Sequence, residues 1–199
     1  MIKKIIFYLT CLFCYSSFLY ADMNPFQRQT YANTTVGVSI TGPDGWYLEV
    51  KSSPKEKGSF FQEASPPGLV AIFSSNDRIM TLPASERGNF GMIFISLFQP
   101  HLDAIKLMDP YSTATKELFV GENMIDPPQI LKFKGRSWLV TRVKKTYGEN
   151  VSNIAYQITY ITVVPKVTIQ IDTFTPSQSY ESNRKLYDNM ISHVTFDGK

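Results

Sequence analysis

The sequence contains few of the side chains on which catalysis commonly depends. Its 199 residues include 2 cysteines and 2 histidines. Both cysteines, Cys11 and Cys14, lie within the first 21 residues. The rest of the chain therefore has no disulfide, no thiol nucleophile and no cysteine-based zinc site. The two histidines, His101 and His193, are too far apart in sequence to form a histidine metal-binding motif.

The first 21 residues have the three parts of a secretory signal peptide. Lys3 and Lys4 form a basic start, residues 5–12 are mostly apolar, and Ala21 provides the small residue at the end. Leu19 stands two residues before Ala21, as signal peptidase prefers. We predict cleavage after Ala21, which leaves residues 22–199 as a single domain of a length that can bury a core.

A retained membrane anchor and a lipoprotein are the alternatives for this segment. The 16 residues of 5–20 are interrupted by polar side chains, whereas a spanning helix needs roughly 20 apolar residues. A lipobox needs a small residue directly before its cysteine, but Thr10 precedes Cys11 and Phe13 precedes Cys14. We therefore expect a periplasmic or secreted protein without a transmembrane segment after cleavage.

Basic and acidic residues nearly balance once the leader is removed. Lys3 and Lys4 leave with it, so 20 basic residues fall to 18 against 17 acidic ones. A net charge of about +1 creates no long-range field for nucleic acid. Any electrostatic recognition must come from a local group of charges.

The first half of the chain predicts strands separated by turns. Alternating residues predict an N-terminal hairpin of Val36–Ile40 and Trp46–Val50 around the turn Gly42–Gly45. Leu69–Phe73 is a short apolar strand. Met92–Phe98 is apolar at both odd and even positions, which indicates a central strand covered on both faces or a short buried helix segment. Its β-branched and aromatic residues and the flanking Gly91 and Pro100 favour the strand.

The second half predicts a run of strands and a final helix. Helical turns are expected at 102–108 and 113–120. Four antiparallel strands then follow at Ile130–Phe133, Ser137–Tyr147, Ile154–Val164 and Val167–Phe174. In the fourth strand, Thr168, Gln170 and Asp172 are expected to face water. A helix begins after Pro176, packs on the sheet, and is followed by a short strand at 194–196.

Three motifs stand near the two ends of the chain: VGVSITGPDGW at 36–46, ITYITVVPKVTIQIDTF at 158–174, and ISHVTF at 191–196, preceded by a helix that carries Tyr187. They resemble motifs of the PsbP/Mog1-like superfamily, whose members include exported DcrB-like bacterial proteins. The match covers about the first 30 residues after the leader and the last 70, and leaves the middle unmatched.

The resemblance implies an α+β fold in which a single antiparallel β-sheet has helices packed on both faces. The C-terminal helix is followed by a short last strand. The resemblance also implies a non-catalytic accessory or adaptor protein that binds larger assemblies. The partners of the eukaryotic members, a photosystem and a small GTPase, are not expected for an exported protein.

His101 is the candidate general base of a second hypothesis, a small secreted hydrolase. Ser96 and Asp103 lie nearby in sequence. No Gly-x-Ser-x-Gly elbow is present to hold a nucleophile on a strained turn, so a loop histidine is favoured. His193, between the last helix and strand, is expected to cap helix carbonyls or face solvent. We expect no catalytic, cofactor or metal site.

Charge is unevenly distributed in one stretch of the sequence, which is basic. Six cations fall between residues 132 and 145 without an acid: Lys132, Lys134, Arg136, Arg142, Lys144 and Lys145. A hairpin that presented them could hold an anionic envelope component or an acidic protein surface. The alternative, which is favoured, is that cations on an exposed strand deter edge-to-edge pairing. Trp46 and Trp138 are expected to be core anchors.

The sequence as a whole favours an exported, non-catalytic binding or adaptor protein of the cell envelope or extracellular space. Its partner would meet the basic hairpin or the loop Ser52–Gly68, and the protein itself would be a monomer. The hydrolase using His101 and a secreted effector or surface antigen are the alternatives.

Overall fold

The computed structural model describes residues 28–50, 68–77, 82, 86, 89–98, 123–146, 154–165 and 167–196. The predicted leader, residues 52–67 of the predicted loop, His101 and the expected helical turns at 102–108 and 113–120 lie outside these residues. No helix within the described ranges is long and apolar enough to cross a membrane.

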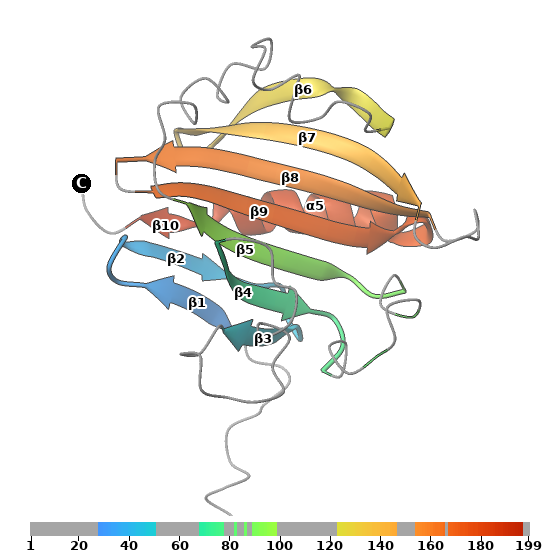
Figure 1. Cartoon of the computed structure of the whole chain (residues 1–199), viewed down its shortest axis with the longest axis horizontal. Coiled ribbons are helices and arrows are strands. Elements are labelled where there is room, and N and C mark those ends of the chain that lie inside the picture. Colours follow the sequence, from blue (N-terminus) through green and yellow to red (C-terminus); the bar gives the residue numbers. More distant parts are fainter. Residues whose placement is uncertain are drawn as a thin grey trace, which may run out of the picture.

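The described chain forms two antiparallel sheets (Figure 1). The larger has seven strands in the order β3-β4-β5-β9-β8-β7-β6, and the smaller has the order β1-β2-β10. The strands of the larger sheet are β3 (Tyr47–Val50), β4 (Leu69–Ser74), β5 (Met92–Phe98), β6 (Asn123–Phe133), β7 (Arg136–Thr146), β8 (Ile154–Val164) and β9 (Val167–Pro176). Those of the smaller are β1 (Thr30–Asn33), β2 (Val38–Thr41) and β10 (Thr195–Phe196).

Four long strands in the second half are consecutive neighbours in the larger sheet, as predicted. β7 pairs with β6 and β8, and β8 pairs with β9, all antiparallel. β6 begins earlier than expected, at Asn123, and its register shifts near Pro127 and Pro128. The predicted central position of Met92–Phe98 is also confirmed, because β5 lies between β4 and β9.

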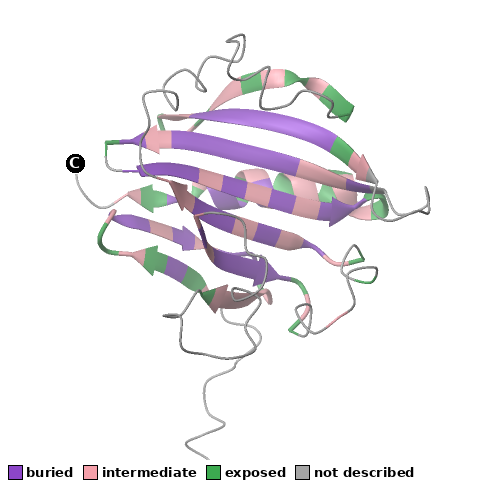
Figure 2. Ribbon diagram, viewed as in Figure 1, coloured by how far each residue is buried: buried purple, intermediate pink, exposed green. Residues whose placement is uncertain are grey.

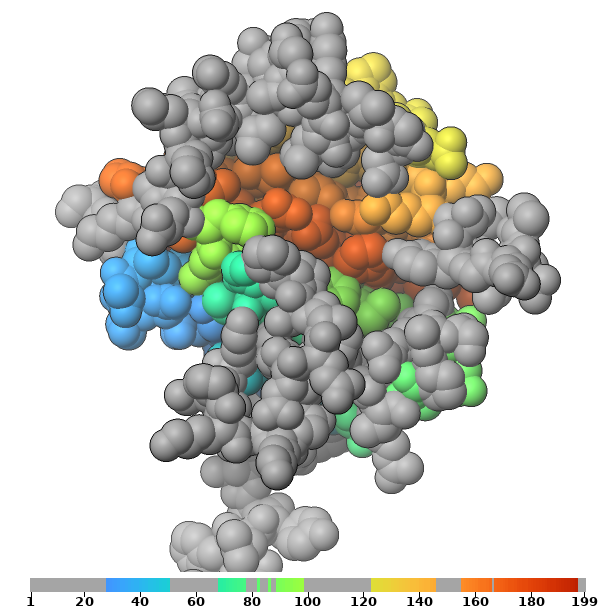
Figure 3. All heavy atoms as spheres, viewed as in Figure 1, coloured from blue at the N-terminus to red at the C-terminus, as the bar shows by residue number. Residues whose placement is uncertain are grey.

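The main core lies on one face of the larger sheet. Helix α5 (Tyr180–Ser192) follows the 3₁₀ turn η3 (Ser177–Ser179) and packs there with the smaller sheet. Tyr187, Met190 and Ile191 are the buried residues of α5. They join side chains of both sheets, among them Val38, Ile40, Phe73, Ile95, Trp138, Tyr160 and Ile171. Figure 3 shows the atoms of β1 and β2 gathered at one side of the larger sheet.

The face of the larger sheet away from α5 is also buried in part (Figure 2). Alternation along the strands places Ile72, Leu139 and Ile161 on this face, and each is at most 2% exposed. The expectation that Thr168, Gln170 and Asp172 face water is therefore wrong. Thr168 is buried, and the other two are half-buried in a polar cluster.

Asp172 is the centre of that polar cluster. Its carboxylate accepts hydrogen bonds from Gln157 Nε2 at 3.0 Å, Thr159 Oγ1 at 2.6 Å and Gln170 Nε2 at 2.8 Å. Three donors replace much of the hydration that the carboxylate loses in this position. Gln170 and Asp172 of β9 thus bond to each other, and Asp172 also bonds to β8, rather than facing solvent.

The expected single sheet with helices on both faces is wrong. Within the ranges described above, the chain forms two sheets, and α5 is the one complete helix. The smaller sheet joins β1 and β2, near the start of the described chain, to β10 at its end. Strands of two to four residues are too short for alternation to reveal such a distant pairing.

The predicted N-terminal hairpin is also wrong, because β2 and β3 belong to different sheets. β2 pairs with β1 and β10, whereas β3 pairs with β4. The turn between them redirects the chain instead of folding it back. Gly45 has a φ of 74°, and Gly42 packs closely against the ring of Phe73. A turn is therefore present at Gly42–Gly45, as its residues predict, but the two strands that it joins do not pair with each other.

Two tyrosines hold α5 on the sheet. The Tyr160 hydroxyl of β8 donates to Asp188 Oδ1 at 2.7 Å, and the Tyr187 hydroxyl of α5 donates to the carbonyl oxygen of Phe174 at 3.2 Å. Burial raises the pKa of both phenols well above its usual value. For Tyr160, the negative charge of Asp188 and the hydrogen bond to it add to this rise in pKa. Both side chains are therefore neutral in the folded protein over the physiological range.

The contact between Gly42 and Phe73 predicts a clear stability effect. A Cβ atom on Gly42 would overlap Phe73 Cδ1, and Phe73 is fully buried. We expect Gly42→Ala to lower the free energy of unfolding by about 2 kcal/mol. In a Phe73→Ala background the same change should cost less than about 1 kcal/mol, because the Cγ, Cδ1 and Cε1 atoms that the new Cβ would meet are all removed. Equal costs in the two backgrounds, measured by urea denaturation, would contradict this contact.

The buried tyrosines predict a loss of stability in alkali. Above pH of about 10 the unfolded chain releases the Tyr160 proton while the folded protein retains it, so stability falls as pH rises. We expect Tyr160→Phe to remove about 1.4 kcal/mol per pH unit from that decline. Urea denaturation at several pH values between 8 and 11 measures this slope. An unchanged slope would show that Tyr160 ionises equally well in both states.

Candidate functional site

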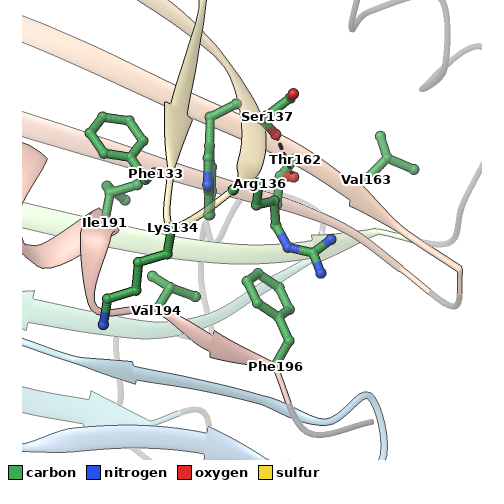
Figure 4. A pocket seen from close by; sticks show the side chains of 11 residues that line it. Phe133, Lys134, Arg136, Ser137, Thr162, Val163, Ile191, Val194 and Phe196 are labelled. Atoms are coloured by element: carbon green, nitrogen blue, oxygen red, sulfur yellow. Dashed lines mark hydrogen bonds between the residues drawn. The ribbon is translucent and has the colours of Figure 1, made fainter. Parts of the chain in front are cut away.

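A half-open groove lies between the tip of the β6–β7 hairpin, β8, the end of α5 and β10 (Figure 4). Its volume is about 560 Å³, which is in the range of small-ligand sites. Six hydrophobic residues contribute to its lining: Phe133, Trp138, Val163, Ile191, Val194 and Phe196. The polar side chains are those of Lys134, Arg136, Ser137 and Thr162.

The hairpin tip is a tight two-residue turn that brings two cations to the groove. Lys134 and Gly135 have φ values of 47° and 80°, as a type I′ turn requires at both central positions. Phe133 and Arg136 are the paired residues that flank the turn. Figure 4 shows the Lys134 and Arg136 side chains extending from this turn towards the segment that contains Val194 and Phe196.

The guanidinium of Arg136 stacks on the last strand. Its Cζ atom lies 3.9 Å from the centroid of the Phe196 ring, within the range of a cation–π interaction. The Phe196 ring also contacts Trp138, with centroids 6.5 Å apart and planes at 50°. Stacking holds the guanidinium by its face and leaves its N–H groups available for a planar anion such as a carboxylate.

The two cations of the groove have no acidic partner among the described side chains. The ion pairs found there are Arg28–Asp44, Arg142–Asp126 and Arg184–Glu181. Lys134 is exposed and Arg136 is half-buried. The groove therefore combines an apolar wall with a positive rim.

The six basic residues of the predicted hairpin do not lie on one surface. Alternation places Lys132 on the face of the larger sheet away from α5, together with the half-buried Lys145, whereas Arg136 lies on the α5 face. Lys144 is exposed at the opposite end of β7. The structure brings only Lys134 and Arg136 of the six to the groove.

Arg142 is a buried member of an ion pair. Its side chain is 9% exposed, and its Nη1 atom donates to Asp126 Oδ2 at 2.9 Å. The Arg142 Nε, the Asp126 Oδ1 and the Tyr180 hydroxyl are buried without a hydrogen-bond partner among the described residues. Asp126 was not recognised from the sequence as its partner, because the register shifts of β6 decide which residues face each other.

The groove contains residues that sequence reasoning missed. Trp138 was expected in the core and is 1% exposed, yet it also lines the groove. Val194 and Phe196 come from the far end of the chain, and no spacing in the sequence connects them to Lys134. The only signal was the expected last strand, whose partner could not be read from its own residues.

His193 caps α5 as expected. Its Nδ1 lies 2.8 Å from the carbonyl oxygen of Asn189 and 3.0 Å from Ser192 Oγ, and the side chain is exposed. Within the ranges that the structure describes, no group of three or more histidine, cysteine or acidic side chains is arranged to hold a metal ion.

Comparison with known proteins gives matches among solved structures only. No protein-family model and no curated protein matches the sequence. The cyanobacterial PsbP (CyanoP) of Synechocystis sp. PCC 6803 is 16% identical, with a TM-score of 0.53 over 88% of this chain and 96% of that one. LpqN of Mycobacterium tuberculosis, involved in cell envelope biogenesis, is 13% identical, with a TM-score of 0.50 over 85% and 90%.

A weaker likeness is to the Ran-binding protein Mog1p of Saccharomyces cerevisiae. It is 10% identical, with a TM-score of 0.46 over 86% of this chain and 96% of that one. At these identities the matches are evidence for the fold alone, and the fold assignment is based on CyanoP and LpqN. The resemblance drawn from the motifs at 36–46, 158–174 and 191–196 is confirmed: this chain has the PsbP/Mog1-like fold.

Proposed function

We propose that this chain is an exported, non-catalytic binding or adaptor protein of the cell envelope or extracellular space, and that its groove holds an anionic part of a partner. The observation that carries the proposal is the pair Lys134 and Arg136. They stand over an apolar wall without an acidic partner among the described residues.

The composition of the groove supports recognition rather than turnover. Its described lining contains no imidazole, carboxylate or thiol that could act as a general base or nucleophile. The Thr162 hydroxyl donates to the carbonyl oxygen of Ser137 at 2.9 Å, so it serves the β7–β8 pairing. Apart from the Ser137 hydroxyl, what remains is an aromatic and aliphatic wall beside two cations, the composition of a binding surface.

Export is proposed on the N-terminal residues. The basic, apolar and small-residue parts of residues 1–21 support a signal peptide cleaved after Ala21 and a domain of residues 22–199. The fold is also that of LpqN, a protein involved in cell envelope biogenesis. A periplasmic or secreted location is consistent with both observations.

Protection of an exposed strand edge explains only one part of the basic stretch. β6 is an edge strand within the described sheet, and Lys132 is exposed on it, as such protection requires. Lys134 lies in the turn and Arg136 stacks on Phe196, so neither guards that edge. The alternatives of a hydrolase using His101 and of a secreted effector or surface antigen rest on no contact among the described residues.

Reversing the charge of the groove tests the proposal. The double variant Lys134→Glu/Arg136→Glu should retain the fold and capture the native partner at least about tenfold less well, because attraction becomes repulsion. Capture is measured with immobilised residues 22–199 and an envelope fraction of the native host. Binding of the unaltered protein should weaken as salt concentration rises.

The matched control is Lys144→Glu/Lys185→Glu, which changes the net charge equally at two exposed positions away from the groove. It should capture the partner as the unaltered protein does. Equal loss in both double variants would assign the effect to net charge. No loss in the groove variant would remove Lys134 and Arg136 from partner binding.

A further inference from the structure

We infer that the groove receives an extended acidic peptide segment, which adds to β10 as a further strand of the smaller sheet. The inference rests on the proposed function and names the chemistry of the partner. Two features carry it: an edge strand bordering the groove, and two cations positioned above that strand.

β10 has one occupied edge and one open edge within the described chain. It pairs with β2 through Thr195↔Ser39 and Phe196↔Val38, and no other described strand pairs with it. In an antiparallel ladder, successive residues direct their N–H and C=O groups alternately towards the partner strand and away from it. One of the two β10 residues therefore directs its backbone groups to the open side.

The groove lies along that open side. Figure 4 shows β10, with Phe196, between the blue strands of the smaller sheet and the labelled residues of the hairpin tip. Phe196 and Val194 line the groove together with Trp138. A strand added at this edge would thus pass between β10 and the tip, where its apolar side chains could contact the aromatic wall.

The charges at the rim select an acidic segment. The Arg136 guanidinium is fixed over Phe196 at 3.9 Å and offers its N–H groups to a carboxylate. Lys134 adds a second positive charge from the adjacent turn. A peptide with acidic side chains at alternate positions would place them all on one side of its strand, and its other side would remain apolar.

An open strand edge favours a peptide over a lipid. A fatty acid or anionic lipid could satisfy the cations and the wall, but it has no repeating amide groups to pair with β10. Strand addition uses the backbone for affinity and the side chains for selection. Blocking the N–H groups of a bound peptide should therefore weaken its binding only if the peptide pairs with β10 as a strand.

The probe is an acetylated, fluorescently labelled six-residue peptide of alternating valine and glutamate, titrated with residues 22–199 and followed by fluorescence anisotropy. We expect saturable binding that weakens at least about tenfold in Lys134→Glu/Arg136→Glu and is unchanged in Lys144→Glu/Lys185→Glu. The same peptide with alternate amides N-methylated, in each of the two registers, is the direct test of strand addition. One register should lose binding by at least about tenfold, because it removes the N–H groups that face β10.

Several results would overturn the inference. Equal binding of both N-methylated peptides and the parent would exclude strand addition. Binding to phosphatidylglycerol vesicles that depends on Lys134 and Arg136, without any binding of the peptide, would assign the groove to a lipid. Loss of native partner capture in the groove variant, together with no peptide binding, would leave the proposed function standing and remove only the peptide.

Discussion

The pairing of β10 with β2 is the contact on which both the second sheet and the groove depend. It joins Thr195 and Phe196 to Ser39 and Val38 across almost the whole described chain. Closing so long a loop costs conformational entropy, and the core between the two sheets offsets this cost with α5 residues such as Tyr187. The same pairing places Phe196 against Trp138 and beneath Arg136. A change that released β10 would therefore open the core and dismantle the groove together.

Long-range pairing also marks the limit of what the sequence could predict. β7, β8 and β9 are long, alternate clearly and follow one another, so local patterns suffice to place them. β1, β2 and β10 have two to four residues each, and their pairing is decided by packing against the larger sheet. For this reason the single-sheet prediction was wrong, although the motifs of the superfamily were recognised correctly.

The candidate site was predictable in part for the same reason. Lys134 and Arg136 fall between the predicted strands Ile130–Phe133 and Ser137–Tyr147, so their place at a hairpin tip could be predicted from the sequence. The partner surface around Phe196 could not, because it comes from the other end of the chain. Arg142 shows the opposite error, since charge alone suggested a surface residue. The register shifts of β6 instead bring Asp126 beside it in a half-buried pair.

We propose that the Lys134–Trp138 tip and the Val194–Phe196 segment form one recognition surface. Backbone amide chemical shifts of residues 22–199, recorded by NMR with and without the captured partner, test this most directly. We expect the largest changes to fall together on these two segments, whose first residues lie 60 positions apart in sequence. Changes concentrated on β3 and β4, with both segments unaffected, would contradict it.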